Sequence, residues 1–164
     1  MFKPCIFVSV KTLTLIRHAH AEGGINTADL DRALSDRGHT EARIQSDLFP
    51  LPDDAVLLIS PARRTLETAK HWLKQQPNLK SEMVKDLYNA DYENILEVIQ
   101  DHGDCKHVVV FAHNPGISEL YQYLTNEWMA FEPCTVAILN MDGCEKNLTR
   151  GKAIALSLQF PNNP

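Results

Sequence analysis

The chain has 164 residues, of which 44% are hydrophobic and 23% charged, and its formal net charge at pH 7 is -5. This length and composition suit a globular protein with a single core. The negative charge disfavours nucleic acid as the main partner, because a phosphate backbone favours a basic face. No apolar run approaches the roughly 20 residues of a membrane span. We therefore expect neither nucleic acid nor a membrane among the partners.

The first eleven residues precede the first predicted strand and are largely apolar. Pro4 interrupts this segment and no clear cleavage site follows, so an N-terminal extension over residues 1–11 is favoured over a secretion signal. The four cysteines form no C-x-x-C pair and lie next to no histidine at a zinc-like spacing. We expect free thiols in a reducing cytoplasm, with a Cys134–Cys144 disulfide as the alternative.

Strand and helix signals alternate along the rest of the chain. Buried strands are predicted at 12–16, 56–59 and 108–112, and two further strands at 135–141 and 153–159. Helices are predicted at 35–49 and 92–101, and in the segments that follow Pro61 and Gly116. This alternation predicts an α/β fold, a three-layer α/β/α sandwich with a mainly parallel central sheet. We expect residues 12–164 to form one domain, because no repeat or linker interrupts them.

Local patterns predict how the first two helices begin and which side they bury. Ser35 is expected to cap the first helix, with Gly38 approaching another backbone segment closely. Ser60 and Pro61 fit an N-cap followed by proline at the first helical position. The side chains expected to face the core are Ile44, Leu48 and Phe49 in the first helix, and Leu66, Ala69 and Leu73 in the second.

The run Arg17-His18-Ala19-His20-Ala21-Glu22, directly after the first predicted strand, is the most informative stretch. Later strand ends add Ser60 with the Arg63-Arg64 pair, and His113. Because the carboxyl ends of parallel strands meet at one sheet edge, we expect these positions to converge. Two arginines and two histidines around one point suit a phosphoryl group, since arginine binds phosphate oxygens in pairs and a neutral imidazole can attack phosphorus.

Four motifs, in this order, resemble those of the histidine phosphatase superfamily, which has the phosphoglycerate mutase-like fold. They lie at 15–19, 31–38, 60–69 and 110–116, and the resemblance covers roughly 12–126. The Arg-His-Ala-x-Ala-Glu form, the short length and the His-Asn-Pro-Gly turn are most similar to SixA-type phosphohistidine phosphatases. The resemblance implies a phosphoglycerate mutase-like α/β fold and a phosphatase that dephosphorylates phosphohistidine in proteins.

The resemblance also implies a role for each matching residue. His18 would be the nucleophile that accepts the phosphoryl group, and Arg17 would clamp the phosphate. The second arginine follows the motif's serine by four positions, which selects Arg64 over Arg63. His113 would hold phosphate oxygens and stabilise the transferring group. No metal or other cofactor is implied, because the arginines and His113 supply the positive charge.

Three further residues are weaker candidates. Asn114 and His20 are expected to line the site as substrate-binding residues. Larger phosphoesterase relatives carry a glutamate as general acid, and Asp86 is the nearest equivalent in this chain. A phosphohistidine leaves as an imidazole, which needs less proton assistance than an alkoxide. The missing strong acid therefore favours phosphohistidine over sugar phosphates.

The chain has little room for lid segments after the second motif, so an open, shallow pocket is expected. Such a pocket suits a phosphorylated protein side chain, with a small phosphorylated metabolite as the alternative substrate. We expect a cytoplasmic monomer that acts in signal transduction.

Two interpretations from other classes remain open. In a metal hydrolase, His18, His20 and His113 would be ligands, but Arg17 and Arg64 would then be cations beside a metal. Activity that survives EDTA would eliminate it. In an inactive phosphate-binding module the same pocket would bind phosphate or vanadate without turnover.

Overall fold

A computed structural model describes residues 10–142 and 148–161. Its strands form one sheet in the order β3-β2-β4-β1-β5-β6. Their bounds are β1 Thr12–Arg17, β2 Val56–Ile59, β3 Lys80–Met83, β4 His107–Ala112, β5 Val136–Asn140 and β6 Ile154–Gln159. The first four strands in the sheet order are parallel, whereas β5 is antiparallel to β1 and β6 to β5. The predicted α/β fold with a mainly parallel sheet is confirmed.

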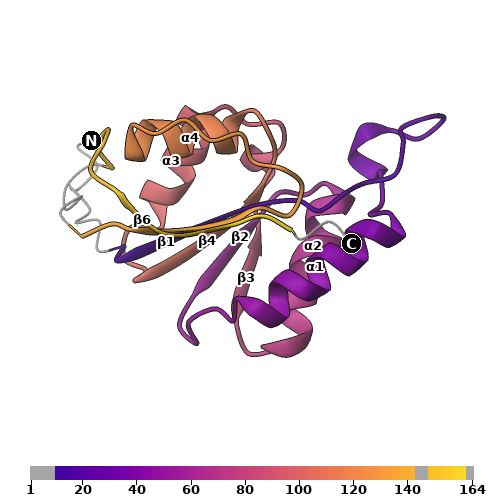
Figure 1. Cartoon of the computed structure of the whole chain (residues 1–164), viewed down its shortest axis with the longest axis horizontal. Coiled ribbons are helices and arrows are strands. Elements are labelled where there is room, and N and C mark those ends of the chain that lie inside the picture. The colour runs from indigo at the N-terminus through magenta and orange to yellow at the C-terminus, as the bar shows by residue number, and fades with distance from the viewer. Residues whose placement is uncertain (1–9, 143–147, 162–164) are drawn as a thin grey trace, which may run out of the picture.

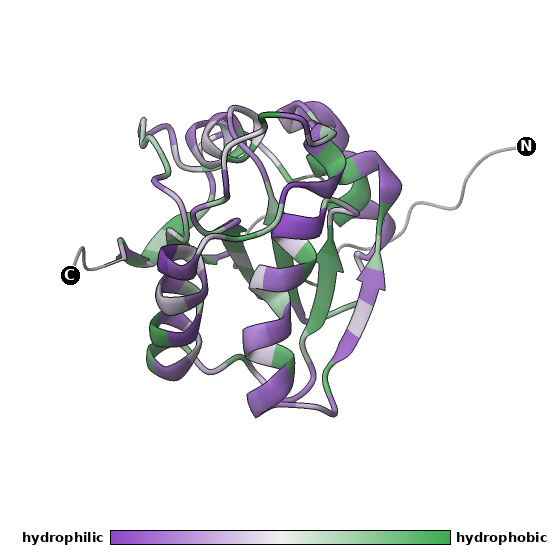
Figure 2. Ribbon diagram, turned by 90° about the vertical axis from the view of Figure 1, so that its right-hand side faces the viewer, coloured by the Kyte–Doolittle hydropathy of each residue, from purple (hydrophilic) through white to green (hydrophobic). Residues whose placement is uncertain are grey.

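Helices cover both faces of this sheet (Figure 1). Their bounds are α1 Asp36–Leu48, α2 Arg63–Gln75, α3 Tyr92–Asp101 and α4 Gly116–Thr125, with short 3-10 turns η1 Asp29–Asp31 and η2 Lys85–Leu87. One apolar cluster joins the sheet to α3 and α4, and a second joins it to α1 and α2. Figure 2 shows green apolar strands in the sheet interior, a largely purple strand at its edge, and helices in which purple residues alternate with white and green ones. The layers are those of an α/β/α sandwich.

The alternation of side chains along β4 explains both clusters. Val108 and Val110 pack toward α3 and α4, whereas Val109 and Phe111 pack toward α1 and α2. A strand that is buried on both faces has no polar side to expose, which is why its sequence is a continuous apolar run. Trp72 of α2 is fully buried against Phe111, with ring centroids 5.4 Å apart.

The predicted inward face of α1 was wrong for Ile44 and Leu48, whereas Phe49, the C-cap residue, packs against the second apolar cluster. Leu48 is 58% exposed, and Ile44 and Phe49 are only half-buried. The buried face carries small and polar side chains instead: Ala42 packs in the second apolar cluster, and the polar side chains meet loop backbone. Glu41 Oε2 accepts a hydrogen bond from the His20 amide at 3.1 Å, and Gln45 Nε2 donates to a loop carbonyl at 3.0 Å.

The predicted start of α2 was also wrong. The helix begins at Arg63 after Ala62, which makes no side-chain cap, because the Ser60 hydroxyl bonds elsewhere. Leu66 is 37% exposed, and the inward residues are Arg64, Thr65, Thr68, Ala69 and Trp72. The sequence also did not predict β3, whose side chains are all exposed. An edge strand with little burial has no apolar pattern to detect.

Several other predictions have definite outcomes. Ser35 caps α1 by accepting a hydrogen bond from the Gly38 amide at 3.1 Å. Cys105 and Cys134 are free thiols, and Cys144 lies outside the described residues. Residues 1–9 of the expected extension also lie outside them. No helix in the described part of the chain is long and apolar enough to cross a membrane.

Candidate active site

The carboxyl ends of β1, β2 and β4 meet at one edge of the sheet. Beyond β1, the His18 amide donates to the Ala112 carbonyl at 3.2 Å, and beyond β2 the Ser60 amide donates to the Phe111 carbonyl at 3.1 Å. These bonds continue the parallel ladders, so His18 and Ser60 flank His113. The rings of His18 and His113 have centroids 5.2 Å apart. Residues from distant parts of the sequence therefore share one site.

His18 is held in a single tautomer. Its Nδ1 lies 2.8 Å from the carbonyl oxygen of Ala19. A carbonyl only accepts, so Nδ1 carries the proton and Nε2 keeps its lone pair. Burial lowers the pKa of His18 from 6.5 to about 4, aided by the charges of Arg64 and Arg17 and opposed by the bond to Ala19. His18 is therefore a neutral imidazole at pH 7, with Nε2 as its nucleophilic atom.

His113 is 4% exposed, and its Nε2 lies 2.7 Å from the hydroxyl of Ser60. Its Nδ1 is buried and has no hydrogen-bond partner among the described residues. Burial lowers the pKa of His113 to about 3, with the charges of His18 and Arg64 contributing. When Ser60 donates to Nε2, the neutral ring presents Nδ1–H as a donor. The sequence placed Ser60 among the converging strand-end residues but gave its side chain a capping role, whereas the hydroxyl bonds to His113.

Two arginines reach this edge of the sheet. Arg17 Nη1 donates to the Phe131 carbonyl at 2.7 Å, and its Nε is buried without a partner in the described structure. Burial lowers the pKa of Arg17, although a guanidinium stays charged at pH 7. Arg64 is 4% exposed and points inward, whereas the Arg63 side chain is 59% exposed and pairs with Glu67 at 2.8 Å. We call Arg17, His18, Arg64 and His113 the phosphate cluster.

Two residues that the sequence interpretation missed lie against this cluster. Asp29, in η1, accepts from Arg64 Nη2 at 3.0 Å and from the Tyr88 hydroxyl at 2.8 Å. Tyr88, directly after η2, also lies edge-on to His113, with ring centroids 5.9 Å apart. Neither residue belongs to a periodic pattern or follows a predicted strand, so no sequence signal singled them out.

Asn114 joins the scaffold of the site. Its Nδ2 donates at 2.9 Å to the Phe131 carbonyl, the same oxygen that Arg17 binds. Its Oδ1 accepts from the Ser118 hydroxyl at 2.8 Å. Asn114 therefore fixes the loop carbonyl that orients Arg17.

His20 and Asp86 make no hydrogen bond with the phosphate cluster in the described residues. The Nδ1 of His20 lies 2.7 Å from the Ser35 hydroxyl, and a Cβ on Gly38 would clash with the His20 carbonyl. The sequence predicts this close approach of Gly38 to another backbone segment. It allows α1 to pack directly against the loop after β1. Asp86 is exposed and has no hydrogen bond or ion pair with the phosphate cluster in the described part of the chain.

The side chains that could bind a metal ion are not clustered in residues 10–142 and 148–161. No three or more histidine, cysteine, aspartate or glutamate side chains there are arranged to hold a metal ion. The ligand set required by the metal-hydrolase interpretation is therefore not assembled by the described residues.

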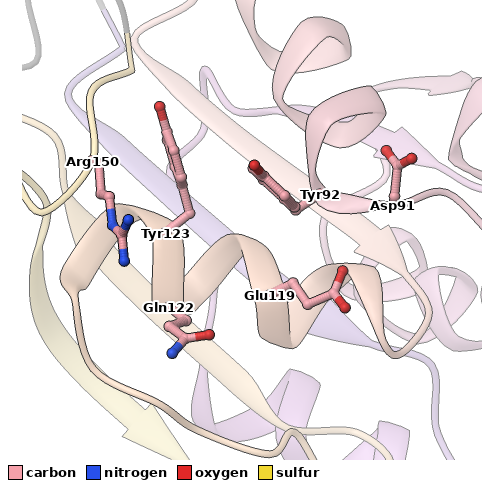
Figure 3. A pocket seen from close by; sticks show the side chains of 6 residues that line it. All are labelled: Asp91, Tyr92, Glu119, Gln122, Tyr123 and Arg150. Carbon is pink, nitrogen blue, oxygen red and sulfur yellow. The ribbon is translucent and has the colours of Figure 1, made fainter.

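A separate cavity of about 390 Å³ lies on the α3–α4 side of the molecule (Figure 3). It is lined by Asp91, Tyr92, Glu119, Gln122, Tyr123 and Arg150. The ring centroids of Tyr92 and Tyr123 lie 5.3 Å apart. Arg150 Nε donates a hydrogen bond to Asn126 Oδ1 at 3.3 Å. The lining includes no member of the phosphate cluster, so this cavity is not the site described above.

The lowered pKa values of His18 and His113 predict a pH dependence. In phosphate-free buffer, both rings are expected to stay neutral as the pH falls through 6.5 and to gain protons only near 4 and 3. Between pH 6.5 and these lowered pKa values, the two histidines bind more protons in the unfolded chain than in the folded one. The free energy of unfolding therefore falls as the pH drops below 6.5. NMR titration of the ring signals, assigned with His18→Ala and His113→Ala, measures this. A midpoint near 6.5 for either ring would contradict it.

Comparison with known proteins identifies the family and the fold. The profile of the histidine phosphatase superfamily (branch 1) matches residues 13–95. A search of curated proteins finds no match. Among solved structures, a protein from Nakamurella multipartitia described as a phosphohistidine phosphatase SixA has a TM-score of 0.80 and 26% identity, covering 93% of this chain and 97% of its own.

Two more structures extend this comparison. The corresponding protein from Agrobacterium tumefaciens has a TM-score of 0.79 and 23% identity, covering 93% of this chain and 99% of its own. A mycobacterial glucosyl-3-phosphoglycerate phosphatase has a TM-score of 0.67 and 13% identity, covering 89% and 97%. Both share the fold. With the family profile matching half of its length, the chain belongs to the histidine phosphatase superfamily, branch 1, and is a hydrolase that acts as a phosphatase.

Proposed function

We propose that the protein is a metal-independent phosphohistidine phosphatase that acts on phosphorylated proteins through a covalent intermediate on His18. The observation that carries this proposal is the fixed tautomer of His18, which leaves the Nε2 lone pair free on a ring that feels the charges of Arg64 and Arg17. Arg17 and Arg64 would bind the phosphoryl oxygens, and His113 Nδ1–H would bind a further oxygen. These charges would stabilise the phosphoryl group as it transfers.

In the first step, the His18 Nε2 lone pair attacks phosphorus. A P–N bond to His18 forms as the P–N bond to the substrate imidazole breaks, and the leaving imidazole keeps that electron pair and takes a proton from solvent. The partner of Nδ1 stays in place throughout, because the Ala19 carbonyl can accept from a neutral or a phosphorylated ring. The product of this step is phospho-His18.

In the second step, a water oxygen attacks the phosphorus of phospho-His18. The P–O bond forms as the P–Nε2 bond breaks, the electron pair returns to Nε2, and the water proton passes to solvent or to the released phosphate. Neutral His18 is regenerated with its original tautomer. The phosphoryl oxygens have to be held in both steps, so Arg17, Arg64 and His113 would bind them in each step.

The acid–base groups around the cluster favour a leaving group that needs little protonation. Among the described residues, Asp29 supplies the carboxylate that bonds to the phosphate cluster, through Arg64. The hydrogen bonds from Tyr88 and Arg64 lower the pKa of Asp29 to about 2. An aspartate this acidic is ionised and cannot donate a proton at pH 7. An alkoxide leaving group would depend on such a donor, whereas an imidazole is a far better leaving group. Asp86 remains the weaker proposal for a proton donor.

Substrate comparison tests this assignment. The kcat/KM for a phosphohistidine peptide is expected to exceed that for an alkyl phosphate by about 10² or more, the usual contribution of a positioned general acid. Asp86→Asn is expected to reduce alkyl phosphate hydrolysis more than phosphohistidine hydrolysis. Equal kcat/KM values for both substrates would favour a small-molecule phosphomonoesterase, the second candidate. Binding of vanadate without any turnover would favour an inactive phosphate-binding module.

The proposal extends to place and partner. Free thiols at Cys105 and Cys134 fit a reducing cytoplasm. There, a monomer with its phosphate cluster at the sheet edge would meet phosphorylated signalling proteins. We propose further that residues 1–11 are an extension of a single catalytic domain over 12–164.

A further inference from the structure

Asp29 uses both of its oxygen-bearing groups to hold Arg64. Arg64 Nη1 donates to the Asp29 backbone carbonyl at 2.6 Å, and Nη2 donates to the carboxylate oxygen Oδ2 at 3.0 Å. Both terminal nitrogens of the guanidinium therefore point at one residue. This two-pronged arrangement is the one by which arginine binds a phosphate.

The same carboxylate is bound from two more directions. Tyr88 donates to Oδ2 at 2.8 Å, and Arg32 Nη1 binds Oδ1 at 3.1 Å. Arg32 also donates from Nε and Nη2 to the Glu22 carbonyl, each at 2.9 Å, which ties η1 to the base of its loop. That loop projects from the sheet edge beside α1 and α2 (Figure 1). The hydrogen bonds of Arg32 therefore hold the segment that carries Asp29 in place beside Arg64.

Charge explains why an anion belongs at this position. Arg64 is 4% exposed, and a buried guanidinium without a counter-ion is unfavourable. The Asp29 side chain is 45% exposed, so water can replace the partners that it gives up when it turns away, whereas Arg64 is enclosed by protein. When no ligand is bound, Asp29 is the partner of Arg64 that an incoming anion can replace.

Resting on the proposed function, we propose that Asp29 is a resident anion on Arg64 which the phosphoryl group has to displace, and that it thereby sets the affinity of the site for phosphate. A phosphoryl dianion and the Asp29 carboxylate cannot both occupy the Arg64 fork without repulsion. Every phosphoryl ligand therefore loses the same binding free energy to this exchange. A phosphorylated protein recovers the loss through contacts beyond the phosphoryl group, but inorganic phosphate makes none. Asp29 thus favours large substrates and speeds release of the product.

The test is the binding of inorganic phosphate to purified full-length protein by isothermal titration calorimetry at neutral pH. Asp29→Asn keeps the shape of the side chain and a carbonyl oxygen for Arg64 while removing the charge. Removing a like charge this close to the ligand is expected to lower the Kd for phosphate by about tenfold or more. Asp31→Asn is the matched control: Asp31 is an exposed residue of the same turn, and its side chain makes no hydrogen bond or ion pair in the described structure. Its Kd is expected to stay within about twofold of wild type.

The outcomes separate this inference from the proposed function. Tighter phosphate binding by Asp29→Asn alone supports the resident anion. Unchanged or weaker binding overturns it, and weaker binding would show that Asp29 instead orients Arg64. Equal tightening by Asp31→Asn also overturns it, because the effect would then be net charge. Arg64→Ala reports on the pocket itself: if it binds phosphate as wild type does, the proposed phosphate site is wrong whatever Asp29 does.

Discussion

Replacing His18 with alanine is expected to reduce phosphohistidine phosphatase turnover by roughly 10⁴-fold or more, because removal of a nucleophile leaves only binding and charge stabilisation. Among the described residues, the second imidazole of the cluster cannot substitute for it. The second imidazole, His113, has its Nε2 bonded to Ser60, and its pKa is lowered to about 3 by burial. Steady-state kinetics with a phosphohistidine peptide measure the loss. Near wild-type activity in His18→Ala would show that another atom attacks phosphorus.

The fold of this variant is expected to be intact. His18 is half-buried and belongs to neither apolar cluster, so its loss removes little core packing. His39→Ala is the matched control: it removes an imidazole from the exposed edge of the α1–α2 contact, where the His39 side chain is 47% exposed and lies beside His71. Its activity and melting temperature are expected to equal those of wild type. A loss in both variants would indicate a general effect on the protein rather than on the nucleophile.

Replacing Arg64 with alanine is expected to lower kcat/KM by about 10²–10³-fold, the usual cost of removing one charge-stabilising donor from a transition state. Arg64→Lys retains the charge but not the planar fork, so it is expected to recover only part of the loss. Arg63→Ala is the matched control from the adjacent position. Arg63 points outward and pairs with Glu67, so this change is expected to alter kcat/KM by less than about twofold.

The two arginines therefore give a direct comparison within one turn of α2. Equal losses at both positions would mean that the guanidinium groups act through the overall field and not by contact. A large loss at Arg63 with little at Arg64 would reverse the assignment. Thermal unfolding of each variant separates either result from misfolding.

The sequence predicted those parts of the fold that depend on strongly apolar, locally periodic segments. The β4 run, buried on both faces, and the α3 and α4 patterns were located correctly because each depends on burial of a continuous set of side chains. The inward face of α1 was mispredicted, since Glu41 and Gln45 are buried to satisfy loop backbone groups. That requirement arises only in the folded structure and leaves no periodic trace in the sequence.

The candidate site divides in the same way. Arg17, His18 and His113 could be located because each lies at the end of a strand, where the parallel ladder fixes its neighbours. Asp29 and Tyr88 could not, because they reach Arg64 and His113 from irregular segments. Contacts of that kind depend on how the loops cross the sheet edge. They are visible only in three dimensions.

Intact-mass spectrometry of the phosphoenzyme tests the central proposal most directly. Wild-type protein and His18→Ala would each be mixed with a phosphohistidine donor in EDTA and quenched rapidly under denaturing, alkaline conditions. One added phosphoryl group on wild type, lost in acid and absent from His18→Ala, is the predicted result. Continuing turnover without any adduct, or an adduct that persists in His18→Ala, would contradict covalent catalysis by His18.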